Sequence, residues 1–295
     1  MENKNILYQY KNGNTLVTLL HNGTKIREYE DTPISDFPES IDIKITNYCD
    51  LGCSFCHESS TTKGVHGDLN KLITTLTGLP KGTEIAIGGG NPLDHPELLN
   101  FLNEVKELGL VPNITINQGH VLKHIDLITH LIEDKLVYGV GISLTSNNWK
   151  GVDKVMEITE NVVFHIILGI HNHSILSELK EKYGSPKVLL LGYKVWGFGK
   201  EYYSEEIEKE IKKWYQQLSR YFGKMIISFD NLAIEQLNLK RFFSPVGWEK
   251  FYMGDDFKHT MYIDAVKQEY SPTSRSGERV SFNDMDLLTY FKTRL

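Results

Sequence analysis

The run Ile45-Thr-Asn-Tyr-Cys49-Asp-Leu-Gly-Cys53-Ser-Phe-Cys56 contains every cysteine of this 295-residue chain. The three cysteines have C-x3-C-x2-C spacing, and Phe55 stands directly before the last of them. Three thiolates this close in sequence can face one iron–sulfur cube from a single loop. A [4Fe-4S] cluster held by three thiolates keeps one iron without a protein ligand. Since an open iron can bind a small molecule, the spacing favours chemistry at the cluster over plain electron transfer.

A structural zinc site is the alternative interpretation, with His57 or His66 completing a tetrahedron around the metal. His57 directly follows Cys56, which makes closing that tetrahedron awkward. Structural zinc sites also favour paired short cysteine spacings, which this chain lacks. The cluster is therefore the preferred interpretation, ahead of zinc and of free thiols that come together by coincidence.

The cysteine run resembles the cluster-binding motif of the radical S-adenosylmethionine (SAM) superfamily. In that family the amino and carboxylate groups of SAM occupy the fourth iron. Electron transfer from the reduced cluster breaks a carbon–sulfur bond of SAM and yields a 5′-deoxyadenosyl radical. The resemblance implies Cys49, Cys53 and Cys56 as metal ligands, a [4Fe-4S] cluster and S-adenosyl-L-methionine as cofactors, and an external flavodoxin- or ferredoxin-like one-electron reductant.

Composition sets the broad class of the protein. Hydrophobic residues make up 40% of the chain and charged residues 24%, which is ordinary for a globular protein. The net charge of -6 provides no basic field for extended nucleic-acid binding. No apolar run reaches the length of a membrane span, the polar start is not a signal peptide, and clustered thiols suit a reducing compartment. We expect a cytoplasmic protein that makes no membrane contact.

Three segments differ in their pattern. Residues 1–38 predict a small β-meander followed by a proline-containing linker, because Asn-Gly pairs at Asn12 and Asn22 are strong hairpin signals. Residues 39–229 alternate strand-like and helix-like patterns, and Asp94 with Glu97 predicts a capping box on the second helix. The expected strands of this segment are Ile41–Ile45, Thr83–Ile87, Asn113–Ile116, Val140–Leu144, Val162–Ile167 and Val188–Leu191.

Six β/α units imply an α/β fold with a parallel sheet and helices outside it. Periodicity alone does not distinguish an open doubly wound sheet from a curved partial barrel. The family resemblance implies a (β/α)6 partial TIM barrel with the cluster loop after its first strand. Reactive groups at the carboxyl ends of parallel strands agree with the general rule for such sheets.

Residues 230–295 form the third segment, predicted to be a C-terminal α+β extension that covers the barrel mouth. A hairpin is expected around Thr260–Ile263 and Lys267–Tyr270. It resembles the hairpin that opens auxiliary-cluster domains in peptide-modifying radical SAM enzymes. This segment has no cysteine, so an auxiliary cluster with cysteine ligands is ruled out. Its many aromatic side chains need burial against another surface.

The sequence Gly88-Gly89-Gly90-Asn91-Pro92 follows the second strand and resembles the family's Gly-Gly-Glu-Pro motif. In the family, the backbone and acidic side chain of this motif meet the amino group of SAM. Glycine lets a backbone approach a ligand closely. Asn91 replaces the glutamate, and its amide oxygen can accept a hydrogen bond but carries no charge.

Three more strand ends resemble SAM-contacting segments of the family less specifically. They begin at Ile116, Ile142 and Leu191. Read alone, each is as well explained by an ordinary strand end. The resemblance implies cofactor-binding roles for Phe55, Gly89, Gly90, Asn91, Pro92, Asn117, Ser143, Tyr193 and Lys194.

No catalytic residue is identified from the sequence, and the candidates are His120, His171 and Tyr193. The two histidines fall on the active-site side of the expected barrel, and a tyrosine can donate a hydrogen atom to a substrate radical. His165 is expected to be packed in the core. No cysteine remains as a hydrogen donor, which disfavours epimerisation schemes that require one.

The expected function is a radical SAM enzyme, an oxidoreductase or transferase, that acts on a peptide or protein side chain. The substrate rests on the hairpin resemblance. A small metabolite or nucleotide within a closed pocket is the second interpretation. A non-enzymatic module stabilised by zinc or a cluster is the third, and metal analysis separates it from the other two.

Overall fold

The computed structural model describes residues 5–294. Its first part is an antiparallel three-stranded sheet in the order β1-β2-β3, which confirms the predicted β-meander. Both turns use an Asn-Gly pair, in which Gly13 and Gly23 have φ of 60° and 82°. Glycine adopts this left-handed conformation without steric cost. The strands are β1 (Ile6–Asn12), β2 (Thr15–Leu20) and β3 (Lys25–Glu28).

A ten-stranded sheet forms the centre of the molecule, in the order β10-β9-β8-β7-β6-β5-β4-β11-β12-β13. All neighbouring strands from β10 to β4 are parallel, which confirms the six expected strands and the partial barrel. The short β10 was not predicted. The parallel strands are β4 (Ser40–Thr46), β5 (Glu84–Gly89), β6 (Val111–Asn117), β7 (Gly139–Ser143), β8 (Val162–Ile167), β9 (Lys187–Leu191) and β10 (Ile226–Phe229).

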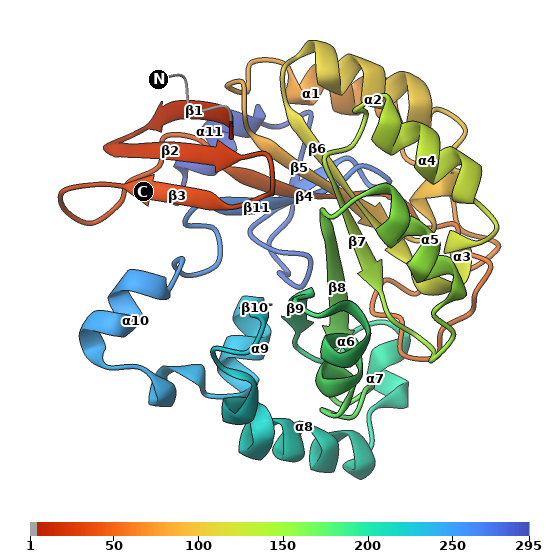
Figure 1. Cartoon of the computed structure of the whole chain (residues 1–295). Helices are drawn as coiled ribbons and strands as arrows, with labels where there is room; N and C mark the ends of the chain where they lie inside the picture. The colour runs from red at the N-terminus through yellow and green to blue at the C-terminus, as the bar shows by residue number, and fades with distance from the viewer. Residues whose placement is uncertain (1–4, 295) are drawn as a thin grey trace.

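Helices cover the outer side of this sheet (Figure 1). The outward-facing Ile41, Ile43 and Ile45 of β4 are at most 2% exposed and belong to the main core. No helix of the described residues is long and apolar enough to cross a membrane. The longer helices are α1 (Leu69–Leu76), α2 (Leu98–Glu107), α4 (Ile125–Glu133), α5 (Lys150–Ile158), α6 (Ile175–Tyr183) and α8 (Glu205–Gln217).

Short helical turns connect these elements, and one of them overturns a sequence prediction. The capping box at Asp94 is wrong, because α2 begins at Leu98 with Glu97 as its N-cap and has no side-chain cap bond. Asp94 ends a separate turn that Pro92 starts. The short turns are η1 (Pro92–Asp94), α3 (Gln118–Val121), α7 (Phe198–Tyr202), η2 (Leu218–Tyr221), α9 (Asn231–Gln236), η3 (Leu239–Phe242), α10 (Pro245–Phe251) and α11 (Leu287–Lys292).

The C-terminal segment extends the central sheet beside β4. Its strand β11 (Thr260–Asp264) pairs in parallel with β4. The antiparallel partners β12 (Glu269–Ser271) and β13 (Val280–Ser281) follow, and β11 with β12 forms the predicted hairpin. Met261 and Ile263 of β11 are 1% and 0% exposed. In contrast, α10 has no buried residue and stands apart from the barrel (Figure 1).

The turn between β2 and β3 closes the barrel at the amino-terminal ends of its parallel strands. The Nζ of Lys187, at the start of β9, donates to the carbonyl of Asn22 at 2.7 Å and to Oδ1 of Asn161 at 3.1 Å. Lys25 forms an ion pair with Glu84 at the start of β5. The meander therefore forms a floor beneath the barrel.

The replacement Ile263→Ala tests the role of β11 in the fold. We expect the free energy of unfolding to fall by about 2–5 kcal/mol, because a fully buried side chain is removed from the core. Ile26→Ala, at a β3 position that is 44% exposed, is the matched control and should cost less than about 1 kcal/mol. Equal losses in urea denaturation would show that β11 is not part of the cooperative core.

A buried histidine next to β11 generates a pH prediction. His259 is 4% exposed and its Nδ1 lies 2.6 Å from Ser35 Oγ. Burial lowers the pKa of His259 to about 4. Between pH 6.5 and pH 4 the unfolded chain binds a proton here that the folded chain does not, so stability is lost as the pH falls. In His259→Gln, the slope of unfolding free energy against pH in this window should decrease by up to about 1.4 kcal/mol per pH unit. A slope that is unchanged in His259→Gln would contradict this prediction.

Candidate active site

The cysteine loop follows β4 and places its three thiols on one wall of a cavity. Cys49, Cys53 and Cys56 are all half-buried and all line this cavity. Burial raises the pKa of the Cys49 and Cys53 thiols, and the neighbouring cysteines add to the rise. The amide of Asn117, at the end of β6, donates to Cys53 Sγ at 3.8 Å. The three thiols of the loop are thus partly shielded from solvent, and the Asn117 amide contacts one of them.

The cavity occupies the inside of the barrel and has a volume of about 740 Å³. It exists because small residues face inward on two strands, whereas a filled barrel has branched side chains there. Its volume is typical of ligand-binding pockets. The small inward residues are Ala86 and Gly88 of β5 and Gly139 and Gly141 of β7.

The glycine-rich end of β5 lies directly against the cysteine loop. Gly90 N donates to the carbonyl of Thr46 at 2.8 Å, and Asn91 N donates to the carbonyl of Tyr48 at 2.6 Å. A Cβ on Gly90 would lie 2.1 Å from the Tyr48 carbonyl oxygen. Gly89 has φ of 117°, which only glycine adopts readily. Glycine is required here because two backbones approach each other.

Asn91 is fully buried, and its side chain is used within its own turn. Its Nδ2 donates to Asp94 Oδ2 at 2.7 Å, and its Oδ1 accepts from Leu93 N at 3.3 Å. Gly89 and Gly90 line the cavity, whereas Asn91 and Pro92 lie behind its wall. A local cap therefore holds the side chain at the position where the family's motif has glutamate.

A polar network connects this turn to the cysteine loop. His120 Nε2 lies 2.7 Å from Asp50 Oδ1, and Lys123 Nζ lies 3.2 Å from Asp50 Oδ2 and 3.5 Å from Asp94 Oδ2. Ligand atoms of Cys49, Asp50 and His120 lie within 4.8 Å of one another. Asp50, between the first two cysteines, is thereby held by His120 and Lys123.

The candidate catalytic side chains bond to protein groups. Besides the Asp50 contact of His120, His171 Nε2 donates to the carbonyl of Leu144 at 2.8 Å, and burial lowers the pKa of His171. The Tyr193 hydroxyl donates to the carbonyl of Gly199 at 2.7 Å. None of these three side chains is among the described residues that line the cavity.

The other expected cofactor-binding residues, Phe55, Asn117, Ser143 and Lys194, line the cavity from different elements. Lys194 Nζ lies 3.2 Å from His57 Nε2 and 3.0 Å from Ser274 Oγ of the C-terminal segment. The second histidine considered for zinc, His66, has its Nδ1 2.9 Å from Thr46 Oγ1. Both histidines are thus engaged with groups other than the thiols.

Several cavity residues were missed by the sequence analysis. The charged Asp42 and Lys44 alternate along β4 with isoleucines, which is the signal for an inward polar face in a strand that is otherwise buried. His165, expected to be packed, lines the cavity beside Gly141, and burial lowers its pKa to about 4. Further cavity residues that no sequence signal identified are Thr115, Ser228, Tyr262 and Ser274.

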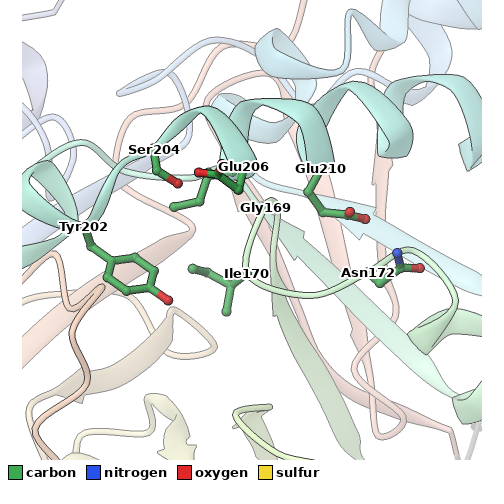
Figure 2. A pocket seen from close by; sticks show the side chains of 8 residues that line it. Gly169, Ile170, Asn172, Tyr202, Ser204, Glu206 and Glu210 are labelled. Carbon is green, nitrogen blue, oxygen red and sulfur yellow. The ribbon is translucent and has the colours of Figure 1, made fainter.

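A second hollow of about 580 Å³ lies between the loop after β8 and the start of α8. Figure 2 shows Tyr202 and Ile170 on one side of it and Glu210 and Asn172 on the other. It shares no lining residue with the barrel cavity, and no thiol lines it. Tyr202 connects the two regions, because its ring centre lies 6.0 Å from that of Phe55. The three cysteines line the barrel cavity instead.

Comparison with solved structures shows a shared fold. Crystal structures of Streptococcus suis SuiB match when bound to precursor peptide SuiA (TM-score 0.59, 17% identity), bound to S-adenosylmethionine (0.60, 15%), and as SuiB with no partner named (0.58, 16%). Each match covers 88% of this chain. It covers 65–66% of the SuiB chain, so this chain spans just under two thirds of that length. No curated protein matches the sequence.

One family model matches most of the barrel segment. Residues 43–175 match the family model described as the radical SAM superfamily. This stretch contains the cysteine loop and the glycine-rich end of β5. A donor set of three thiols beside a cavity of ligand size suits the family's two cofactors, a [4Fe-4S] cluster and SAM. The chain therefore carries a radical SAM domain over residues 43–175.

Proposed function

We propose that Cys49, Cys53 and Cys56 hold a [4Fe-4S] cluster and that SAM binds beside it in the barrel cavity. The observation that carries this proposal is the placement of three thiols from one loop on the wall of a single cavity. When bound, these cofactors supply a 5′-deoxyadenosyl radical that takes a hydrogen atom from the substrate. The engagement of His57 and His66 with Lys194 and Thr46 argues against a zinc tetrahedron.

The chain's own residues would position the cofactors and exclude water. We propose that the cavity-lining Phe55, Gly89, Gly90, Asn117, Ser143 and Lys194 contact SAM. Asn91, Pro92 and Tyr193 would act from behind the wall by fixing the backbone. The catalytic roles of His120, His171 and Tyr193 stay predictions, and so does the external flavodoxin- or ferredoxin-like reductant.

A peptide or protein side chain is the proposed substrate. The support is the fold shared with SuiB, which has been crystallised with a precursor peptide. The C-terminal segment also contributes Tyr262 and Ser274 to the cavity, so it can contact a substrate. A small metabolite is the second candidate, since the β2–β3 turn closes the cavity below and the volume suits a small ligand.

Anaerobic reconstitution tests the cluster and the SAM chemistry together. The protein should bind about four irons and four sulfides, and with dithionite and SAM it should form 5′-deoxyadenosine. Alanine at Cys49, Cys53 or Cys56 should abolish both the brown chromophore and the product. A protein that binds only zinc and forms no 5′-deoxyadenosine would contradict the proposal.

Gly90→Ala tests the close approach between β5 and the cysteine loop. The added Cβ would clash with the Tyr48 carbonyl, so the loop must shift and iron retention should fall severalfold. Gly277→Ala is the matched control, because no atom lies within 4 Å of its added Cβ. Iron content per chain after desalting is the measurement. Equal retention in both variants would show that the loop tolerates the shift.

A further inference from the structure

Most of the charged groups on the cavity wall are neutralised by neighbours. Lys44 Nζ lies 2.6 Å from Asp264 Oδ2 and 3.0 Å from Glu58 Oε2. Lys25 is paired with Glu84. Asp42 differs from these, because its carboxylate has no hydrogen-bond or ion-pair partner among residues 5–294. Asp42 is exposed to the barrel cavity, so its carboxylate is available to a ligand that enters there.

The strand register fixes where the Asp42 side chain lies. Asp42 is paired with Ala86 of β5 and with Tyr262 of β11, and it alternates with outward-facing isoleucines. Its side chain therefore faces the barrel interior and keeps accessible surface toward the cavity. Burial raises the pKa of Asp42, and the nearby charge of Lys194 opposes that rise. Lys194 itself is held by His57 and Ser274 and does not bond to the carboxylate.

The cavity that Asp42 faces also has apolar side chains that suit an aliphatic chain. Val163 and Leu189 line the same cavity from β8 and β9, and Ile226 lines it from β10. The small Ala86 leaves room beside the carboxylate. Tyr262 contributes an aromatic ring, which already has the Arg279 guanidinium 5.3 Å from its centre. A cavity that has a carboxylate on one strand and apolar side chains on others fits a ligand with an alkyl stem and a charged head.

Two lysines on the same wall argue less strongly for an anionic ligand. Lys187 donates to Asn22 and Asn161, and Lys194 contacts His57 and Ser274, so each ammonium has two neutral partners. Asp42 has no such partner. Among the described charged residues of the cavity, Asp42 alone has no hydrogen-bond or ion-pair partner, and a cation is the ligand group that pairs with a carboxylate.

We propose that Asp42 binds the cationic head group of the substrate, a primary ammonium or guanidinium on an aliphatic stem. This inference rests on the proposed function, in which the substrate is a peptide or protein. It adds that the modified side chain is a lysine or an arginine. Asp42 lies four positions before the end of β4, roughly 13 Å below the start of the cysteine loop. A head group held at that depth would leave the stem carbons between the carboxylate and the thiols, where hydrogen abstraction is expected.

Small probes test the site without knowledge of the natural substrate. We would titrate n-butylammonium, n-butylguanidinium, n-butanol and butyrate separately into the reconstituted holoprotein and measure binding by ligand-observed NMR. One of the two cations should bind about tenfold or more tightly than n-butanol. This comparison uses the wild-type protein and does not depend on the folding of a variant. Binding of n-butanol or butyrate as tight as that of both cations would overturn the proposal.

Asp42→Asn then assigns the binding to this residue. The isosteric replacement should weaken binding of the preferred cation about tenfold and leave n-butanol unchanged. Glu84→Gln is the matched control, a cavity carboxylate whose charge is already balanced by Lys25, and it should change cation binding less than about twofold. Cation binding that is unchanged in Asp42→Asn would overturn the proposal.

The two proposals fail separately in this design. Probe binding is measured without SAM, whereas the proposed function is measured by 5′-deoxyadenosine formation. Formation of 5′-deoxyadenosine with no preference for a cation would overturn the role of Asp42 alone. Cation binding that depends on Asp42, in a protein that forms no 5′-deoxyadenosine, would support the site and overturn the proposed function.

Discussion

The Lys44 ammonium lies between the carboxylates of Asp264 and Glu58, at 2.6 and 3.0 Å. These three residues belong to β4, to the C-terminal segment and to the stretch directly after Cys56. Burial disfavours the charged ammonium, but the two carboxylates outweigh this and raise the pKa of Lys44. Breaking such a pair leaves an uncompensated charge in the interior. The interaction therefore couples the cysteine loop to the sheet and makes the C-terminal segment part of the barrel.

The six central strands could be predicted because their outward faces carry branched residues that must pack against helices. In contrast, β10 has only four residues, and its partly exposed side chains give no clear apolar pattern. The position of β11 in the sheet could not be predicted from the sequence for a different reason. Its hairpin with β12 joins residues that are close in sequence and could be predicted, whereas its pairing with β4 joins residues more than 200 positions apart. The hydrophobic periodicity of a strand does not indicate which other strand it pairs with in the sheet.

The candidate site residues that belong to a sequence motif could be predicted. Residues whose role depends on the direction of the side chain could not be predicted as well. Spacing identified the three cysteines, all of which line the cavity. The motif also named Asn91, but whether an amide faces the ligand or its own turn depends on local hydrogen bonds. Here Asp94 and Leu93 hold it inside η1. Pro92 favours this turn because its fixed φ suits the first helical position.

Glycine and alanine have two distinct effects in this barrel. At Gly90, directly after β5, the missing side chain lets the backbone approach Tyr48, the residue before Cys49. At Ala86 and Gly141 it leaves the middle of the barrel hollow, so that Asp42 and His165 keep surface toward the cavity. Larger residues at those positions would fill the barrel and cover the carboxylate. Gly90 thus lets the cysteine loop pack against the end of β5, whereas Ala86 and Gly141 leave the space through which the proposed substrate side chain would reach Asp42.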